Sequence, residues 1–467
     1  MDLSFSFNQL NKSFYQTYSL VNFSEREVYQ LLVDEFQKKN SPLVVDFKLL
    51  FKNIYKNNVS HDIHSYPGKL YPNLARFFCK ALYTPEEKNK FLDPFSGSGT
   101  TIVEAMLEGY ETYYCDINPL ALLLTKVKTT PLTQLEIEEN LVTLTRIYNN
   151  ITKFDSINVI NQDHWYDKRI KLELDKLINS IKLLKNNDVV DLFKVAFSHL
   201  ARKMSYCDLQ VSVPVKIKLK PNFSDSRKRE IERRLDYIST ANTLKDFIQI
   251  VEKFSESINL LSNETRHNNT FEPKLLCNDI NLIDKKNFFD LIITSPPYGA
   301  AQKYIRSSSL SLNWLELSDP NEVTILCNTS IGKERVSQKD REKADIYIET
   351  LDKKYQETLY AIKESNLNRY YIMLTYLYEM EKGLDKLSQA VKNKGKIVLI
   401  VGNNTVSNQF FHNDIFLSDI MKKNGFHLEI HLIDFIKTRG LMIKRNKTSG
   451  IINYESILVF QKNEHSY

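Results

Sequence analysis

Two parts of the chain alternate short apolar runs with helical patterns. In residues 61–130, the apolar pair Phe91-Leu92 precedes a glycine-rich turn, a helical pattern over 101–107 and a strand pattern over 112–115. In the second part, from residue 271, strand patterns cover 274–279, 290–293, 396–402, 428–436 and 454–460. Gly395 and Gly425 precede two of these patterns and are expected to mark helix ends. The alternation predicts βαβ units and therefore an α/β fold.

Two other segments have helical spacing without strand patterns. Within residues 1–60, the run 23–27 is followed by apolar residues at the spacing of a capped amphipathic helix. Residues 131–270 are rich in leucine, lysine, glutamate and asparagine, and their apolar positions recur at helical intervals. We therefore predict an N-terminal helical extension over 1–60 and a mostly helical insertion over 131–270.

Composition limits the function only broadly. The 467 residues suffice for two or three domains, and 42% apolar and 26% charged residues are ordinary for a soluble globular protein. The net charge of +6 barely favours an anionic partner at this length. Apolar runs of membrane-spanning length, signal-peptide features, CxxC pairs and metal-like cysteine clusters are all missing from the sequence. We expect a cytoplasmic protein with no membrane contact and no metal site.

The glycine-rich turn is the first candidate site. Gly97 and Gly99 separate a predicted strand from a predicted helix, where a backbone without Cβ atoms can approach a ligand closely. Asp93 ends that strand and suits an ammonium group, such as that of the methionine part of S-adenosylmethionine. Asp116 ends the next strand, where a carboxylate can accept both ribose hydroxyls, and Asp279 follows a further strand, where it could hold an adenine amino group.

Each of these features alone also fits a simpler structure. A tight turn explains the glycines, and a helix cap or turn explains each aspartate. Acids at three successive strand ends favour a cofactor site over coincidence. A dinucleotide site is the competing interpretation, and the missing GxGxxG spacing disfavours it.

The run 295–298, Ser-Pro-Pro-Tyr, is the second candidate site and directly follows a strand pattern. Two prolines cannot continue sheet pairing, so the chain must turn there with a stiff backbone that holds a carbonyl outward. That carbonyl and the Ser295 hydroxyl can accept hydrogen bonds from an exocyclic amino group, and the Tyr298 ring offers a flat face to a base. A base inside a duplex must be flipped out to reach such a pocket. A packed proline turn is the simpler alternative, which the neighbouring cofactor site disfavours.

The positions of the cysteines bear on the reaction. Methylation at cytosine C5 needs a thiolate nucleophile, commonly within a Pro-Cys pair, and none of the five cysteines follows a proline. Direct transfer to an exocyclic amine needs no covalent nucleophile. The sequence therefore favours methylation of an amino group.

These residues resemble the amino-group DNA methyltransferases, which make N4-methylcytosine or N6-methyladenine. The resemblance covers about residues 61–130 and 271–467. Residues 64–70 are similar to the family's motif X, 93–100 to motif I, Asp116 to motif II, Asp279 to motif III and 295–298 to motif IV. Residues 309–315, 401–404 and 445–460 resemble further segments of the same family.

The resemblance implies a Rossmann-like methyltransferase domain that uses S-adenosyl-L-methionine, with a cofactor half at 61–130 and a catalytic half at 271–467. It assigns cofactor binding to Tyr66, Pro67, Asp93, Pro94, Phe95, Gly97, Gly99, Thr100, Asp116 and Asp279. It assigns catalysis to Ser295, Pro296, Pro297 and Tyr298. Double-stranded DNA is the implied substrate, and a cognate restriction endonuclease is a further partner if the enzyme belongs to a restriction-modification system.

Two details concern the target. Serine in the first position of motif IV is commoner in the N4-cytosine enzymes, whereas aspartate or asparagine is commoner in the N6-adenine enzymes, so Ser295 favours cytosine over adenine. The spelling of motif I is usual in the subgroup in which motif IV comes first, yet motif I comes first here. The insertion over 131–270 then becomes the expected place for target recognition.

Basic residues gather in three stretches that suit contacts with DNA phosphates. The first lies between Arg202 and Arg234, the second on a predicted turn over 437–447, and the third on a loop-like stretch over 335–343. An ordinary solvated surface explains each stretch equally well.

Two other functions stay open. RNA guanine-N2 methyltransferases also place Pro-Pro-Tyr after a strand, but they usually carry an RNA-binding appendage and an acidic or amide residue before the prolines, and the sequence has neither. A catalytically silent DNA-binding subunit of a defence complex is disfavoured by the intact motifs I and IV.

Overall fold

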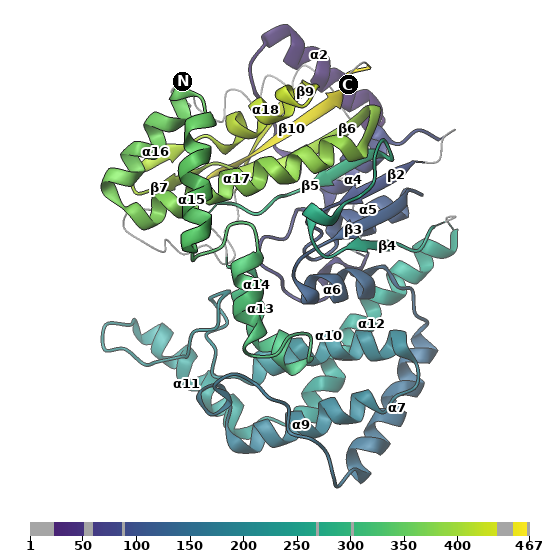
Figure 1. Ribbon diagram of the computed structural model, residues 1–467. Coiled ribbons are helices and arrows are strands. Elements are labelled where there is room, and N and C mark those ends of the chain that lie inside the picture. Colours follow the sequence, from purple (N-terminus) through teal and green to yellow (C-terminus); the bar gives the residue numbers. More distant parts are fainter. Residues whose placement is uncertain are drawn as a thin grey trace.

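An eight-stranded sheet with helices on both faces forms the centre of the protein (Figure 1). The computed structural model describes residues 23–50, 59–85, 89–267, 270–299, 303–436 and 452–464. Across the sheet the strand order is β1-β9-β10-β6-β5-β2-β3-β4. The strands are β1 (Leu43–Val44), β2 (Lys90–Asp93), β3 (Glu111–Cys115), β4 (Lys274–Cys277), β5 (Phe289–Thr294), β6 (Val391–Gly402), β9 (Phe426–Phe435) and β10 (Tyr454–Lys462). Only β10 runs antiparallel to its neighbours among the described strands of this sheet.

Successive residues of each strand point to opposite faces, and each face packs against its own set of helices. Phe91 and Ile293 lie in one core with helices α2 (Glu25–Lys39), α4 (Pro72–Leu82) and α5 (Thr100–Leu107), beside α3 (Phe47–Leu50). Leu92 and Ile292 lie in the opposite core. The helices of that second face are α15 (Gln338–Tyr347), α16 (Lys353–Ser365), α17 (Leu367–Ala390) and α18 (Asn413–Lys423), with the hairpin β7 (Asn404–Val406) and β8 (Gln409–Phe411). The sheet is therefore buried on both faces, as expected for parallel strands.

A separate helical body adjoins the β4 side of the sheet (Figure 1). It contains α7 (Gln134–Asn150), α8 (Gln162–Trp165), α9 (Lys168–Lys182), α10 (Asn187–Met204), α11 (Asp225–Thr240) and α12 (Thr243–His267). Its core also takes in apolar side chains of α6 (Pro119–Thr129) and α13 (Tyr304–Trp314), which precede and follow it in the chain. Trp314 is fully buried there, and its Nε1 donates a hydrogen bond of 2.9 Å to the Tyr166 hydroxyl. These two helices tie the helical body to the sheet.

The α/β prediction is confirmed. All the predicted strands are present, and the helix predicted after the glycine-rich turn is α5. The N-terminal helix is α2, with a capping box in which Ser24 and Glu27 bond to each other's backbone. Residues 1–22 and 51–58 of the predicted extension lie outside the described residues. Along the described ranges, no helix has the length and apolarity to cross a bilayer.

Two local predictions were wrong. Gly395 does not precede a strand but lies within β6, where the register to β5 shifts as β6 advances from Val391 to Lys396. The residues of β6 between Val391 and Lys396 that have no partner in β5 form a local irregularity. The sequence pattern there predicts the end of a helix instead. The stretch 335–343 is loop only in its first part, because α15 begins at Gln338 with Ser337 as its N-cap.

The carboxyl ends of β2 and β5 are joined by a buried side-chain contact. Connections leave β2 toward β3 and β5 toward β6, so the strand order reverses between these two neighbours. Asp93 at the end of β2 is 2% exposed, and its Oδ1 accepts a hydrogen bond of 2.6 Å from the Thr294 hydroxyl at the end of β5. Ligands of α/β sheets bind at such a reversal.

We predict that Thr294→Val destabilises the protein by about 1–3 kcal/mol, because it leaves a buried Asp93 oxygen short of a donor. Thr112→Val is the matched control: Thr112 is also buried in a strand, but its hydroxyl has no hydrogen-bond partner, so valine should be neutral or stabilising. Thermal and urea denaturation measure both. Equal destabilisation by the two variants would contradict the role given to Thr294.

Candidate active site

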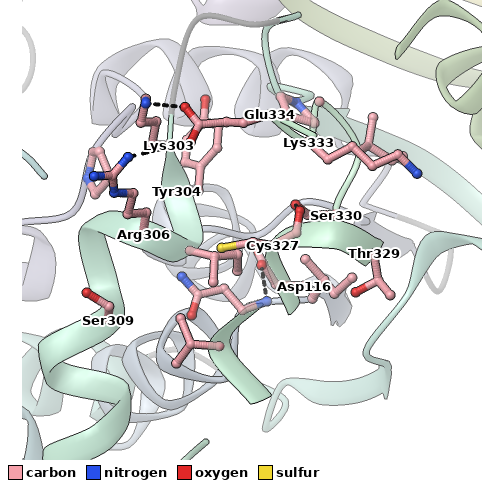
Figure 2. Close-up of a pocket in the computed structure, with 18 of the residues that line it drawn as sticks. Asp116, Lys303, Tyr304, Arg306, Ser309, Cys327, Thr329, Ser330, Lys333 and Glu334 are labelled. Carbon is pink, nitrogen blue, oxygen red and sulfur yellow. Dashed lines mark hydrogen bonds and ion pairs between the residues drawn. The ribbon is translucent and has the colours of Figure 1, made fainter. Parts of the chain in front are cut away.

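A cavity of about 530 Å³ lies at the carboxyl ends of β2, β3, β4 and β5. The turns after these strands line it with Pro94, Phe95, Gly97, Asp116, Ile117, Asn118, Asp279, Ile280, Ser295 and Pro297. Helix α13, helix α14 (Glu322–Thr329) and the loop up to Arg335 form another wall, as Figure 2 shows for Tyr304, Ser309 and Ser330. The helical body adds Trp165 and Pro214. Both runs singled out by the sequence therefore face one cavity.

The turn between β2 and α5 depends on its two glycines. Gly97 has φ +50° and Gly99 has φ +76°, a region that side chains with a Cβ rarely adopt. The Gly97 amide donates a hydrogen bond of 2.8 Å to Asp116 Oδ2. Gly99 has a packing role, because a Cβ on it would lie 2.9 Å from the Cα of Thr125 in α6. The turn is therefore hydrogen-bonded to Asp116 after β3 and packs closely against α6.

Asp116 and Asn118 organise the loop after β3. Asp116 accepts backbone hydrogen bonds of 2.8 Å from Gly97 and from Asn118, and burial raises the pKa of its carboxyl to about 6. The Asn118 amide group donates to the Tyr66 hydroxyl at 2.9 Å and to the Ser308 hydroxyl at 3.1 Å. Its carbonyl caps α6 by accepting from Leu120. One asparagine therefore joins the cavity walls that carry Tyr66, Asp116 and α13.

Asp93 lies beneath the glycine-rich turn. Its oxygens accept hydrogen bonds from the hydroxyls of Thr294 and Thr101 and from the backbone of Phe95, at 3.0 Å for the last. Burial raises the pKa of the Asp93 carboxyl to about 6. Because its bonds run to the protein itself, Asp93 shapes the turn from below. Direct contact with a cofactor ammonium group stays a prediction.

Tyr298, which follows the two prolines, is buried against strands of the sheet. It is 8% exposed, and its hydroxyl donates a hydrogen bond of 2.8 Å to Glu455 Oε1 in β10. Its ring lies against Gly402 of β6, where a Cβ would come within 3.2 Å of it. The next residue, Gly299, accepts a hydrogen bond of 2.5 Å from the Asn404 side chain. The stiff turn that the prolines predict is therefore anchored to β6 and β10.

Most of the predicted site residues share the cavity. Its lining includes Tyr66, Pro67, Pro94, Phe95, Gly97, Asp116, Asp279, Ser295 and Pro297. Asp279 also caps a short 3-10 helix, Ile280–Leu282, by accepting from the Asn281 backbone at 2.8 Å. The others, Asp93, Gly99, Thr100, Pro296 and Tyr298, are buried and do not line the cavity. Whether each contacts a ligand stays a prediction.

Sequence reasoning missed several residues of the site. Arg306 of α13 and Lys303, the residue before that helix, pair with Glu334 at one rim, the Arg306 contact being 3.7 Å (Figure 2). Asn118 gave no signal, since an Asn-Pro helix start is common. Glu455 lies in the segment 445–460 that resembles the family, but the sequence assigned it no role. The thiols of Cys115 and Cys277, far apart in sequence, lie 2.8 Å from each other on β3 and β4.

The three basic stretches have different structural settings. In the first, Lys203 and Arg227 are engaged in ion pairs with Asp246 and Asp208. Its exposed cations are Lys218, Lys220, Arg229 and Arg233, on the loop before α11 and on α11 itself. The second stretch, 437–447, lies outside the described residues. In the third, Arg341 stacks on the ring of Tyr371, 4.8 Å from its centroid.

Comparison with known proteins finds methyltransferases. No protein-family model matches the chain. The chain is 27% identical over 461 residues to the Type II methyltransferase M.MvaI of Kocuria varians, covering 91% of this chain and 94% of that protein. A stretch of 68 residues is 40% identical to the Type II methyltransferase M.MjaII of Methanocaldococcus jannaschii, covering 15% of this chain and 12% of that protein.

The chain is similar along nearly its whole length to a Type II methyltransferase. The similarity to M.MvaI runs along nearly the whole of both chains, so it includes the glycine-rich turn, the Ser-Pro-Pro-Tyr run and the segment between them. A solved structure of a proposed DNA modification methylase from Thermus thermophilus matches 20% of this chain and 38% of its own, at 19% identity and a TM-score of 0.15. That likeness is too slight to carry an argument.

The homology confirms S-adenosyl-L-methionine as the cofactor of this methyltransferase. The cavity fits such a group. Gly97 and Tyr66 both line it, and a Cβ added to Gly97 would be in van der Waals contact with the Tyr66 ring, at 3.5 Å. The absence of that Cβ leaves this part of the wall to a ligand. Two carboxylates, Asp116 and Asp279, line the same cavity and offer acceptors for hydroxyl and amino groups. Among the described residues, no group of three or more histidine, cysteine or acidic side chains is arranged to hold a metal ion.

We predict that Asn118→Ala lowers the affinity for S-adenosylmethionine by about tenfold, or about 1.4 kcal/mol, because Tyr66 and α13 lose their common partner. Loss of the helix cap should also cost about 1 kcal/mol of stability. Asn186→Ala is the control, because Asn186 caps α10 in the same way, by accepting from Asp188 and Val189, away from the cavity. Calorimetric titration and thermal melts separate the two effects. Unchanged affinity in Asn118→Ala would contradict the role of this residue in the cavity.

Proposed function

We propose that the protein is a site-specific DNA methyltransferase that transfers a methyl group from S-adenosylmethionine to the exocyclic N4 of a cytosine flipped out of duplex DNA. The observation that carries the proposal is the shared cavity: Asp116 and Ser295, from the two sequence runs, line the same space. A cofactor held by the first run would have its methyl group beside a base held by the second. Homology to Type II methyltransferases supports the reaction class and the DNA substrate.

The cofactor half of the proposal assigns roles by chemistry. Asp116 accepts hydrogen bonds from the ribose hydroxyls, and Asp279 accepts one from the adenine amino group. Tyr66, Pro67, Pro94, Phe95 and Gly97 form the surrounding wall. Asp93, Gly99 and Thr100 shape the turn. The bound cofactor supplies an electrophilic methyl group on a sulfonium.

The base half uses the strong hydrogen-bond acceptors of the second run. The Ser295 hydroxyl and a backbone carbonyl beside the prolines accept from the cytosine amino group, which raises the electron density on nitrogen as it attacks the methyl carbon. The Pro296 and Pro297 rings keep that backbone stiff. Stacking of the Tyr298 ring on the base stays a prediction, and its hydroxyl holds the turn in place through Glu455. These acceptors bind more strongly as the nitrogen gains positive charge, so they favour the transition state.

Target recognition is assigned to the helical insertion, 131–270. Its residues Trp165 and Pro214 reach the cavity, so a segment bound to the DNA there would lie next to the flipped base. The exposed cations Lys218, Lys220, Arg229 and Arg233 suit phosphate contacts. A restriction endonuclease that cuts the same site is the expected partner of a modification enzyme of this kind.

The methylated base is the first test of the proposal. DNA lacking methylation, incubated with the protein and S-adenosylmethionine and then digested to nucleosides, should yield N4-methylcytosine by mass spectrometry. The hydroxyl of Ser295, rather than an acid or amide, is the reason for expecting cytosine. N6-methyladenine would establish the alternative target and contradict this one. A parallel incubation with RNA tests guanine-N2 methylation, and no methylated nucleoside in either would favour a silent DNA-binding subunit.

The second test uses the pKa of Asp116. Because burial raises this pKa to about 6, the ionised acceptor is lost as the pH falls through that value. Cofactor affinity should be constant above about pH 7 and fall by up to tenfold per unit below about pH 6. The pKa of Asp93 lies in the same range, so a control must separate the two carboxyls. The Asp116→Asn variant serves for this: it should bind S-adenosylmethionine more weakly than the wild type, and its affinity should depend less on pH. Calorimetry across this range measures both, and an identical pH dependence in the variant would exclude Asp116.

A further inference from the structure

Two hydroxyl side chains, Ser295 and Tyr298, lead from the cavity to a buried glutamate, Glu455. Ser295 lines the cavity. Burial and the nearby Glu455 raise the pKa of the Tyr298 phenol, and the Ser295 side chain, three residues earlier on the same turn and near the phenol, partly offsets that rise. The Tyr298 hydroxyl in turn donates to Glu455 Oε1 at 2.8 Å. The chain therefore begins where the amino group of the base would bind and ends at a carboxylate.

The surroundings of the chain hold it in one geometry. Tyr298 is 8% exposed, with its ring against Gly402 of β6. Glu455 belongs to β10, and it is paired in the sheet with Gly402 on one side and Asp434 of β9 on the other. Three strands thus fix the phenol and the carboxylate relative to the Ser295 turn.

We propose that Glu455 receives, through Tyr298 and Ser295, the proton that the amino group of the base releases during methyl transfer. The inference rests on the proposed function. The amino nitrogen forms a bond to the methyl carbon as the bond from that carbon to sulfur breaks, and sulfur keeps the electron pair. The nitrogen then gives a proton to Ser295 Oγ, Ser295 gives its own to the Tyr298 oxygen, and Tyr298 gives its own to Glu455. The products are a neutral methylamino group, a neutral thioether and a protonated Glu455, which later loses its proton to solvent.

The electrostatics of Glu455 suit this role. Burial raises the pKa of its carboxyl, and the bond from Tyr298 partly offsets that rise. A carboxylate that binds protons more readily than usual is a better acceptor near neutral pH. Two other titratable groups lie near these side chains. Tyr304 of α13 contributes to the raised pKa of Tyr298, and Asp434 is the cross-strand neighbour of Glu455.

Glu455 acts through Tyr298, so the experiment must distinguish proton acceptance from mere positioning of the ring. Glu455→Gln keeps an oxygen that accepts the tyrosine hydroxyl but has no basic form. Tyr298→Phe keeps the aromatic ring and breaks the chain. Tyr355→Phe is the matched control, because the Tyr355 hydroxyl also donates to a carboxylate, Asp419 Oδ2, at 2.7 Å, in the α16–α18 region away from the cavity.

Single-turnover methyl transfer to DNA is measured for each protein as a function of pH, with cofactor binding and thermal melts alongside. We expect Glu455→Gln and Tyr298→Phe each to slow transfer by about 10²-fold, the usual contribution of a positioned proton acceptor. Cofactor affinity should not change. The double variant should be no slower than either single one. The wild-type rate should fall at low pH as Glu455 becomes protonated, and Glu455→Gln should lack that fall. Tyr355→Phe should transfer at the wild-type rate.

The carboxyl stretch of Glu455, seen in infrared difference spectra between the wild type and Glu455→Gln without DNA, gives a readout independent of activity. Tyr298→Phe should raise the pH at which this carboxyl protonates, because it removes the bond that favours the ionised form. Rates within about twofold of the wild type in Glu455→Gln or in Tyr298→Phe would overturn the relay alone. A wild-type protein that methylates no DNA would overturn the proposed function and the relay with it.

Discussion

The hydrogen bond between Asp93 and Thr294 is the contact on which the site depends. It closes the gap between β2 and β5, where the strand order reverses and the sheet opens toward a ligand. A buried carboxylate is costly unless donors surround it, and Asp93 has three, from Thr294, Thr101 and the Phe95 backbone. Those donors come from three separate places in the chain. The glycine-rich turn and the Ser-Pro-Pro-Tyr run are therefore held at one fixed separation.

The helical body is joined to this arrangement through α13. One end of the helix contributes Trp314 to the core of the helical body, and Ser308 near its middle bonds to Asn118 beside the cavity. Near its start, the Tyr304 ring packs over Gly68, where a Cβ would lie 3.1 Å away. Helix α13 thus contacts both the core of the helical body and the residues beside Tyr66 and Asp116. This coupling gives a physical reason for placing target recognition between the two halves of the catalytic sheet.

The sequence predicted those parts of the fold whose signals are local. Strands such as 290–293 are short apolar runs next to glycine or proline, and the acids that follow β3 and β4 sit where strand ends meet. Contacts between distant residues left no such signal. Nothing near Glu455 in sequence indicates that its carboxylate meets the Tyr298 hydroxyl, and Asn118 looks like an ordinary helix cap. Gly395 misled because a glycine after a helical pattern usually ends a helix, whereas here the shifted register of β6 accommodates it.

Three carboxyls around the site, Asp93, Asp116 and Glu455, share a raised pKa, with burial as the main cause in each case. Burial without nearby cations costs stability, so a fold under no functional demand would replace them with apolar residues. A positively charged sulfonium in the cavity would offset the cost of burying these carboxylates. The low dielectric that makes their burial costly also strengthens their attraction to the sulfonium. Methyl transfer then removes that positive charge from sulfur and releases a proton. Under the proposed function, Asp116 in the cavity wall and the buried Asp93 and Glu455 favour binding of the cationic cofactor, and Glu455 offers the released proton an acceptor.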